Sequence, residues 1–236
     1  MSTLYLIRHG QASFGSDDYD HLSPRGRQQA RWLGDFMLRA GLRWDAWWSG
    51  PLRRQRQTAD EIMACYQDAG MAVPRPVVAD AFGEYDYESV LRALIPIIVG
   101  EEPAFIHDVD AMMSGRRAFQ KVFGKVMVRW ASGIDRVDTI TAWKTFGNRV
   151  IGGVHDIVDQ SAAGSHVALF TSGGPIAALV GHVLNLAPEK AVTLSWQLVN
   201  ASLTRLQFSS RGIGLDTFNE KGHLERSGDA HMLTYR

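Results

Sequence analysis

An apolar run that stops abruptly at Arg8-His9-Gly10 constrains the fold of this chain more than any other stretch. Residues 4–7 (Leu-Tyr-Leu-Ile) predict a buried strand. A cation, an imidazole and a glycine would be unfavourable in a core, but α/β sheets carry functional loops at the carboxyl ends of their strands. Arg8 offers planar donors for phosphate or carboxylate, and His9 can act as nucleophile, base or acid. We therefore expect a functional site after the first strand, with a plain surface loop as the alternative.

Apolar patterns along the rest of the chain predict strands and helices in alternation, which is typical of an α/β protein with a mainly parallel sheet. Ser23 and Pro24 have the residue types of a helix N-cap and first turn, and Gly41 is expected to end that helix. Residues 13–21 are expected to form a loop. Further strands are predicted at 44–48, 77–78, 166–171, 202–208 and 213–218, and further helices at 52–69, 138–159 and from 173 onward.

Composition limits the classes of protein to which the chain can belong. The 236 residues are 45% hydrophobic and 21% charged, and the formal net charge is zero. This balance is typical of a soluble globular protein and gives no basic field that would attract nucleic acid or an anionic membrane. Cys65 is the only cysteine, which excludes an internal disulfide framework. Because neither a signal peptide nor an apolar run of about 20 residues is recognisable, we expect a cytoplasmic location and no contact with a membrane.

Two further junctions between a strand and a helix carry unusual residues. Arg53, Arg54 and Arg56 fall in the first turns of one predicted helix, where cations oppose the helix dipole unless an anion binds there. Solvated arginines on an exposed helix face are the simpler interpretation for any one of them. Residues 172–174 (Ser-Gly-Gly) either expose backbone N–H groups at the start of another helix or form a plain tight turn. Since such junctions meet at one edge of a parallel sheet, the sequence indicates a phosphate or carboxylate pocket.

The motifs at these junctions resemble those of the histidine phosphatase superfamily, also called the phosphoglycerate mutase-like family. Arg8-His9-Gly10 matches its N-terminal motif, and residues 22–30 are similar to its first-helix pattern. The segment 49–59 is similar to the one that supplies a second arginine, for which Arg54 is a better match than Arg53. Residues 84–88 are similar to the segment that contains the family's acid.

This resemblance implies a three-layer α/β/α sandwich and a metal-independent phosphomonoester hydrolase without a cofactor. His9 would be the nucleophile that forms a phosphohistidine, and Arg8 and Arg54 would bind the phosphate. Glu84 would act as the general acid and base. The expected partner is a small phosphorylated molecule, and the sequence does not predict an oligomeric state. A phosphoglycerate mutase is the alternative enzyme, and a catalytically weak domain that binds a phosphorylated ligand is the alternative from another class.

One position departs from the family pattern. Ser172 stands where the resemblance leads us to expect a second histidine, and with Gly173 it is expected to contact the phosphate. A serine can donate one hydrogen bond but carries no charge, and the loss of a charge-assisted contact weakens catalysis by about 2–3 kcal/mol. Other histidines are candidates to replace it, although each one is individually more typical of a structural role. They are His155, His182, His223 and His231.

The middle of the chain is covered only loosely by the resemblance. Residues 89–136 are interpreted as a mainly helical insertion within a single domain that spans residues 1–236. Its aromatic and basic side chains are expected either to form a lid over the site or to form a small satellite core, and the second interpretation is preferred. The residues concerned are Phe105, Arg116, Arg117 and Phe119.

Overall fold

A six-stranded sheet lies at the centre of the computed structural model, which describes residues 1–13, 20–209, 211–226 and 228–235. The strand order is β3-β2-β4-β1-β5-β6. The first four strands in this order run parallel, whereas β5 is antiparallel to both β1 and β6. The predicted α/β class with a mainly parallel sheet is therefore confirmed. The strands are β1 (Ser2–Arg8), β2 (Ala46–Ser49), β3 (Val77–Val78), β4 (His166–Thr171), β5 (Leu203–Ser209) and β6 (Gly212–Glu220).

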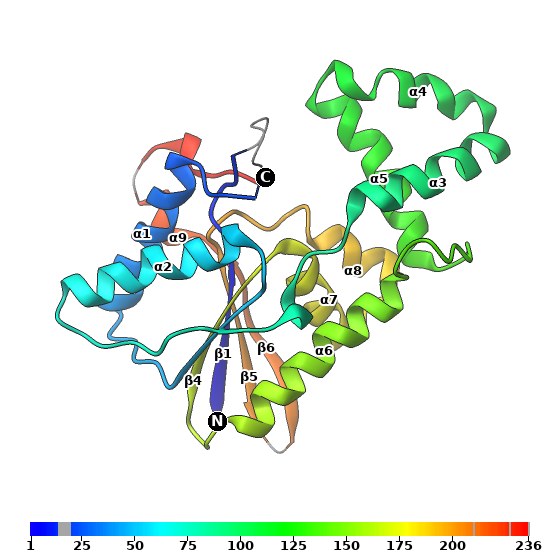
Figure 1. Cartoon of the computed structure of the whole chain (residues 1–236). Helices are drawn as coiled ribbons and strands as arrows, with labels where there is room; N and C mark the ends of the chain where they lie inside the picture. Colours follow the sequence, from blue (N-terminus) through cyan, green and yellow to red (C-terminus); the bar gives the residue numbers. More distant parts are fainter. Residues whose placement is uncertain (14–19, 210, 227, 236) are drawn as a thin grey trace.

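Helices cover both faces of this sheet, as the expected three-layer arrangement requires (Figure 1). Helices α1 (Pro24–Arg39), α2 (Arg53–Asp68) and the short α9 (Gly222–Glu225) lie on one side. On the other side lie α6 (Trp143–Gln160), α7 (Gly173–Val183) and α8 (Pro188–Leu194). The remaining helices, α3 (Tyr87–Glu101), α4 (Ile106–Asp110) and α5 (Arg116–Ser132), rise beyond the carboxyl end of β1.

Alternation of side chains along β1 produces the two cores between these layers. Leu4 and Leu6 pack with the α6 and α7 side, whereas Tyr5 and Ile7 pack with α1 and α2. All four side chains are buried, as expected for a central strand with helices on both faces. Arg8 is the last residue of β1, so the chain leaves the core at that edge of the sheet.

Most of the element boundaries agree with the sequence. The Ser23 side chain accepts a hydrogen bond from the backbone N–H of Gly26, which confirms the predicted N-cap of α1. In contrast, α6 begins at Trp143, five residues after the predicted start, and α8 was not predicted. Residues 14–19 of the expected loop and residue 210 between the last two strands lie outside the described residues.

The segment 89–136 consists mainly of helices and joins the core on the α6 side of the sheet. Phe105 is buried in that main core and does not form a separate satellite core, and Phe119 is only partly buried. Arg116 and Arg117 are exposed. Neither arginine lines the cavity described below, and a lid over the site stays a prediction. None of the helices in the described ranges is long and apolar enough to span a membrane.

Candidate active site

The site is organised around the backbone that follows β1. The N–H of His9 donates to the carbonyl of Thr171 at 2.9 Å, and the carbonyl of His9 accepts hydrogen bonds from Ala201 and Asn200. The N–H of Gly10 donates to the Thr58 hydroxyl at 3.0 Å. These contacts come from β4, α2 and the turn before β5, so they fix the backbone of His9 from three directions.

Gly10 is required by the packing of this turn against α1. A Cβ atom at Gly10 would lie 2.3 Å from the carbonyl oxygen of Gly26, far inside van der Waals contact. The close approach is to the backbone of another element.

Two hydrogen bonds determine the tautomer of His9. Its Nδ1 lies 2.7 Å from the carbonyl oxygen of Gly10, and Arg54 donates from Nε to the His9 Nε2 at 3.1 Å. A carbonyl oxygen can only accept, so Nδ1 carries the hydrogen and Nε2 carries the lone pair. The imidazole is therefore oriented with its nucleophilic nitrogen next to a guanidinium.

The surroundings of His9 also favour its neutral form. Burial, followed by the positive charges of Arg54 and Arg8, holds the pKa of His9 well below its usual value of 6.5. The hydrogen bond to Gly10 acts in the opposite direction and is the smaller effect. At neutral pH the imidazole is thus uncharged and can act as a nucleophile.

The two predicted arginines come from different elements, the end of β1 and the start of α2, but both line the cavity that contains His9. Arg8 is buried and donates to the backbone carbonyls of Leu198 and Tyr235, in the latter case at 3.0 Å. Arg54, the second residue of α2, is also buried, and it forms an ion pair with Asp20 at 2.6 Å. The neighbouring Arg53 is exposed. The structure therefore brings Arg54, and not Arg53, to His9.

Glu84 approaches the same cavity from the loop between β3 and α3. Its carboxylate accepts hydrogen bonds from the backbone N–H groups of Gly174, at 3.0 Å, and Tyr85, at 3.1 Å. Burial raises the pKa of Glu84 above its usual value of 4.5, although these two hydrogen bonds and Arg54 oppose the shift. A Cβ atom at Gly174 would lie only 2.0 Å from the carboxylate. The glycine at the start of α7 thus leaves space for the Glu84 carboxylate.

Ser172 has a different environment from the other predicted residues. Its side chain is fully buried, and its hydroxyl accepts a hydrogen bond from the Gln55 side chain at 2.8 Å. It is not among the residues that line the cavity, whereas the adjacent Gly173 is. The predicted contact of Ser172 with phosphate stays a prediction. His9 is the only histidine among the described lining residues, so none of the four other candidates lies at this cavity.

The cavity that contains these groups has a volume of about 700 Å³, within the range of about 300–1,000 Å³ that is typical of small-molecule sites. Arg8, His9, Arg54, Glu84 and Gly173 all line it. In the described part of the chain no three His, Cys, Asp or Glu side chains are grouped so that they could hold a metal ion. The remaining lining residues are Leu52, Tyr85, Asp86, Tyr87, Glu88, Phe119, Gln120, Phe123, Ser195, Trp196 and Tyr235.

Sequence reasoning missed several of these residues. Asp20 is separated from Arg54 by more than thirty residues, and the carbonyl of Tyr235 reaches Arg8 from the far end of the described chain. Trp196 lies two residues after the end of α8, the helix that was not predicted. A contact made by a backbone carbonyl, such as that of Tyr235, leaves no signal in the sequence. Gln55, the partner of Ser172, could have been found, because it follows Arg54 directly in the segment that resembles the family.

A family model confirms the resemblance. Residues 4–89 and 115–221 match the model described as the Histidine phosphatase superfamily (branch 1). The curated relatives cover much less of the chain. A stretch of 62 residues is 40% identical to the mitochondrial serine/threonine-protein phosphatase Pgam5 of Drosophila grimshawi. This stretch covers 25% of this chain and 22% of that protein.

Solved structures are similar over nearly the whole chain. A phosphoserine phosphatase from Entamoeba histolytica, in complex with phosphoserine, has a TM-score of 0.65 at 20% identity and covers 95% of this chain and 100% of its own. A phosphoglycerate mutase from Bacillus anthracis has a TM-score of 0.64 at 14% identity, with 97% of both chains covered. A mycobacterial glucosyl-3-phosphoglycerate phosphatase with inorganic phosphate has a TM-score of 0.61 at 21% identity, covering 94% of this chain and 98% of its own. At these identities the similarity shows the fold.

Proposed function

The chain belongs to branch 1 of the histidine phosphatase superfamily, and on that premise we propose that it is a metal-independent phosphomonoesterase that acts through a phosphohistidine. The observation that carries this proposal is the orientation of His9. Its Nδ1 donates to the carbonyl of Gly10, and its Nε2 accepts from Arg54 at a cavity that the buried Arg8 also lines. A lone pair held beside Arg8 and Arg54 is suited to attack a phosphoryl group whose oxygens those cations bind.

In the first half of the proposed reaction, Nε2 of His9 attacks phosphorus, and the P–O bond to the leaving group breaks as the N–P bond forms. Before this attack Arg54 transfers its hydrogen bond from Nε2 to a phosphoryl oxygen, which frees the lone pair of Nε2. Glu84 gives its proton to the leaving oxygen, and its raised pKa favours the protonated form that this step needs. The hydrogen bond from Nδ1 to Gly10 stabilises the positive charge that develops on the ring.

In the second half, the Glu84 carboxylate takes a proton from water, and the water oxygen attacks phosphorus as the N–P bond breaks. Phosphate leaves and His9 returns to its neutral form. The backbone N–H of Gly173, at the start of the eleven-residue helix α7, supports the proposal because a helix N-terminus stabilises an anion. It supplies part of the stabilisation that a second histidine would otherwise give.

Trapping the intermediate tests the proposal. The protein is mixed with phenyl phosphate, quenched in alkali and digested, and the peptide that contains His9 is analysed by mass spectrometry. We expect an acid-labile phosphate on His9 and equal rates of release of phenol and inorganic phosphate. Transfer of the phosphoryl group to an added phosphoglycerate, in place of phosphate release, would favour the mutase.

The variant His9→Ala provides the control. Because the imidazole lies in a loop and supports little of the core, we expect a folded protein whose phosphatase activity is lost. Circular dichroism checks the fold. More than a few per cent of residual activity, or a phosphopeptide that excludes residue 9, would show that another group is the nucleophile.

A further inference from the structure

The outer wall of the cavity is built from aromatic side chains. Tyr87 begins α3, Phe119 and Phe123 lie one turn apart on α5, and Trp196 follows α8. Phe123 joins the other three, with ring centroids at 5.6 Å from Phe119, 5.9 Å from Tyr87 and 6.3 Å from Trp196. Three separate elements thus contribute to one continuous aromatic surface.

This surface is not simply the edge of the core. Core aromatic residues nearby, such as Trp130 and Trp143, are almost completely buried and pack against each other at 5.3 Å. Phe119 and Phe123 are only partly buried, and Trp196 is 37% exposed. The wall therefore keeps apolar area available to a ligand, in a cavity of about 700 Å³ that is much larger than a phosphate group.

The charged side chains of this wall indicate which charge a ligand can carry. Asp86 and Glu88 line the cavity and are exposed. Among the described lining residues the only cations are Arg8 and Arg54, which belong to the proposed phosphate site. A leaving group with its own carboxylate would meet two like charges here, and like-charge contacts oppose binding. The wall is therefore matched to an apolar group that carries no negative charge.

We propose that the preferred substrates are aryl phosphomonoesters with an extended, flat leaving group that carries no negative charge, and that Phe123 and Trp196 determine this preference. This inference rests on the proposed phosphatase function. Offset and edge-to-face stacking between the leaving group and these rings holds the ester oxygen beside Glu84. The phosphoglycerates carry a carboxylate and no ring, so the same wall disfavours them.

Three esters with phenolic leaving groups of similar acidity test the inference. They are phenyl phosphate, biphenyl-4-yl phosphate and 4-carboxyphenyl phosphate. We expect kcat/KM to be at least about tenfold higher for the biphenyl ester than for the phenyl ester, and about tenfold lower for the carboxylate, in line with what a binding pocket contributes to discrimination.

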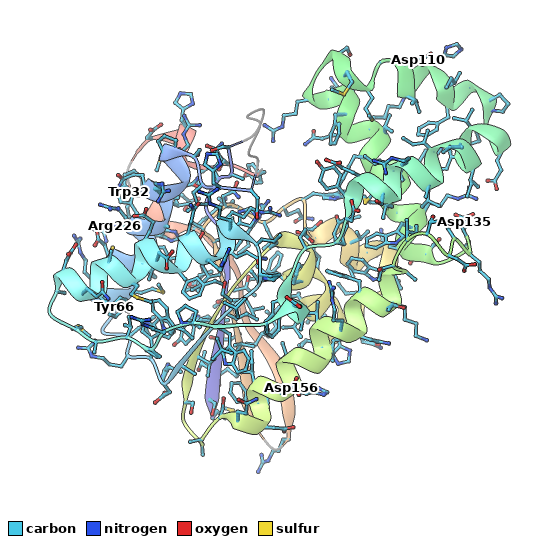
Figure 2. All side chains as sticks on the ribbon, viewed as in Figure 1. Trp32, Tyr66, Asp110, Asp135, Asp156 and Arg226 are labelled. Carbon is cyan, nitrogen blue, oxygen red and sulfur yellow. The ribbon has the colours of Figure 1, made fainter. Side chains whose placement is uncertain are left out.

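Variants identify the surface responsible. Phe123→Ala and Trp196→Ala should each remove most of the biphenyl preference, measured as the ratio of kcat/KM for the biphenyl ester to kcat/KM for the phenyl ester. Trp32, a partly buried tryptophan on α1 that does not line the cavity, gives the matched control Trp32→Ala (Figure 2). Glu88→Lys changes an exposed residue and should raise kcat/KM for the carboxylate ester.

The outcomes separate the two proposals. If phenyl phosphate is hydrolysed through His9 but the three esters have equal kcat/KM, the inference about the leaving group is wrong and the phosphatase function stands. The same holds if Phe123→Ala and Trp196→Ala remain folded and keep the biphenyl preference. If no ester is hydrolysed and no phosphohistidine is trapped, both proposals are wrong.

Discussion

Arg54 makes contacts in the structure that a bound phosphate would have to change. It donates to Nε2 of His9 and forms an ion pair with Asp20, whose second oxygen accepts from the backbone N–H of Arg53. Asp20 thus holds the guanidinium in place before a ligand binds. Because its carboxylate repels an anion, it also opposes the binding of phosphate.

The variant Asp20→Asn tests this balance. We expect inorganic phosphate to bind about fivefold more tightly, which corresponds to roughly 1 kcal/mol, because a competing charge is removed. The melting temperature without phosphate should fall, since the buried guanidinium of Arg54 loses its counter-ion. Calorimetric titration measures the affinity. The same change in an Arg54→Ala background should have no such effect, and tighter binding there would place the competition elsewhere.

Ser172 provides a second test at the scale of one residue. Its side chain is fully buried and bonded to Gln55, which also donates to the carbonyl of Phe82 at 3.1 Å. There is little space for a larger side chain, so Ser172→His should lower the free energy of unfolding by about 1–3 kcal/mol and also lower kcat/KM. Denaturant titration and assays with phenyl phosphate measure the two quantities.

The smaller substitution Ser172→Ala separates the role of the hydroxyl from that of its size. Gln55 retains its bond to Phe82, so a loss of about 1 kcal/mol is expected. If Ser172→His instead raises kcat/KM and leaves stability unchanged, the serine is a weakened replacement for a histidine. The expectation of overpacking, which rests on the burial of Ser172, would then be wrong.

The elements bring the predicted residues together because four parallel strands end at one edge of the sheet. Arg8 and the arginines at the start of α2 could be predicted from the apolar patterns of the strands before them, whereas the choice of Arg54 and the assignment of Glu84 depended on the family resemblance. The start of α6 could not be predicted as well: residues 138–142 are largely polar, and nothing in the periodicity separates them from the first turn. Contacts such as Asp20 with Arg54 depend on tertiary packing, which one sequence does not encode locally.

Contact between the start of α7 and Glu84 gives a prediction at this scale. A methyl group in Gly174→Ala would lie 2.0 Å from the carboxylate and 2.7 Å from the Tyr85 ring, so the acid must move. Misplacing a catalytic group by about 1 Å can cost about a hundredfold in rate, and we expect a loss of that order in kcat/KM.

The control for this variant is Gly152→Ala on α6, where a Cβ atom meets nothing within 4 Å. Alanine in a helix interior is favoured over glycine by roughly 0.5–1 kcal/mol, so Gly152→Ala should raise stability and leave activity unchanged. Equal activity of Gly174→Ala and the wild type would show that the position of Glu84 is not critical.

Stability of the whole molecule should depend on pH through its buried histidines. His223 is 7% exposed, its ring centroid lies 5.8 Å from that of Phe36, and its ring nitrogen Nε2 has no hydrogen-bond partner. Burial lowers the pKa of His223 to about 4, from a usual value of 6.5. Below pH 6.5 the unfolded chain therefore binds a proton that the folded chain does not bind until about pH 4.

The sign follows directly: this histidine favours the folded state less and less as the pH falls from about 6.5 towards 4. With 1.36 kcal/mol for each pKa unit, the contribution lost between pH 7 and pH 5 is about 2 kcal/mol. His9 adds a loss of the same sign because burial also lowers its pKa.

We expect the variant His223→Leu to reduce the difference in unfolding free energy between pH 7 and pH 5 by about 2 kcal/mol. Urea titrations at the two pH values measure it, with the exposed His231→Leu as a control that leaves the difference unchanged. An unaltered pH dependence in His223→Leu would mean that His223 can bind a proton in the folded protein, for example because that region opens at low cost.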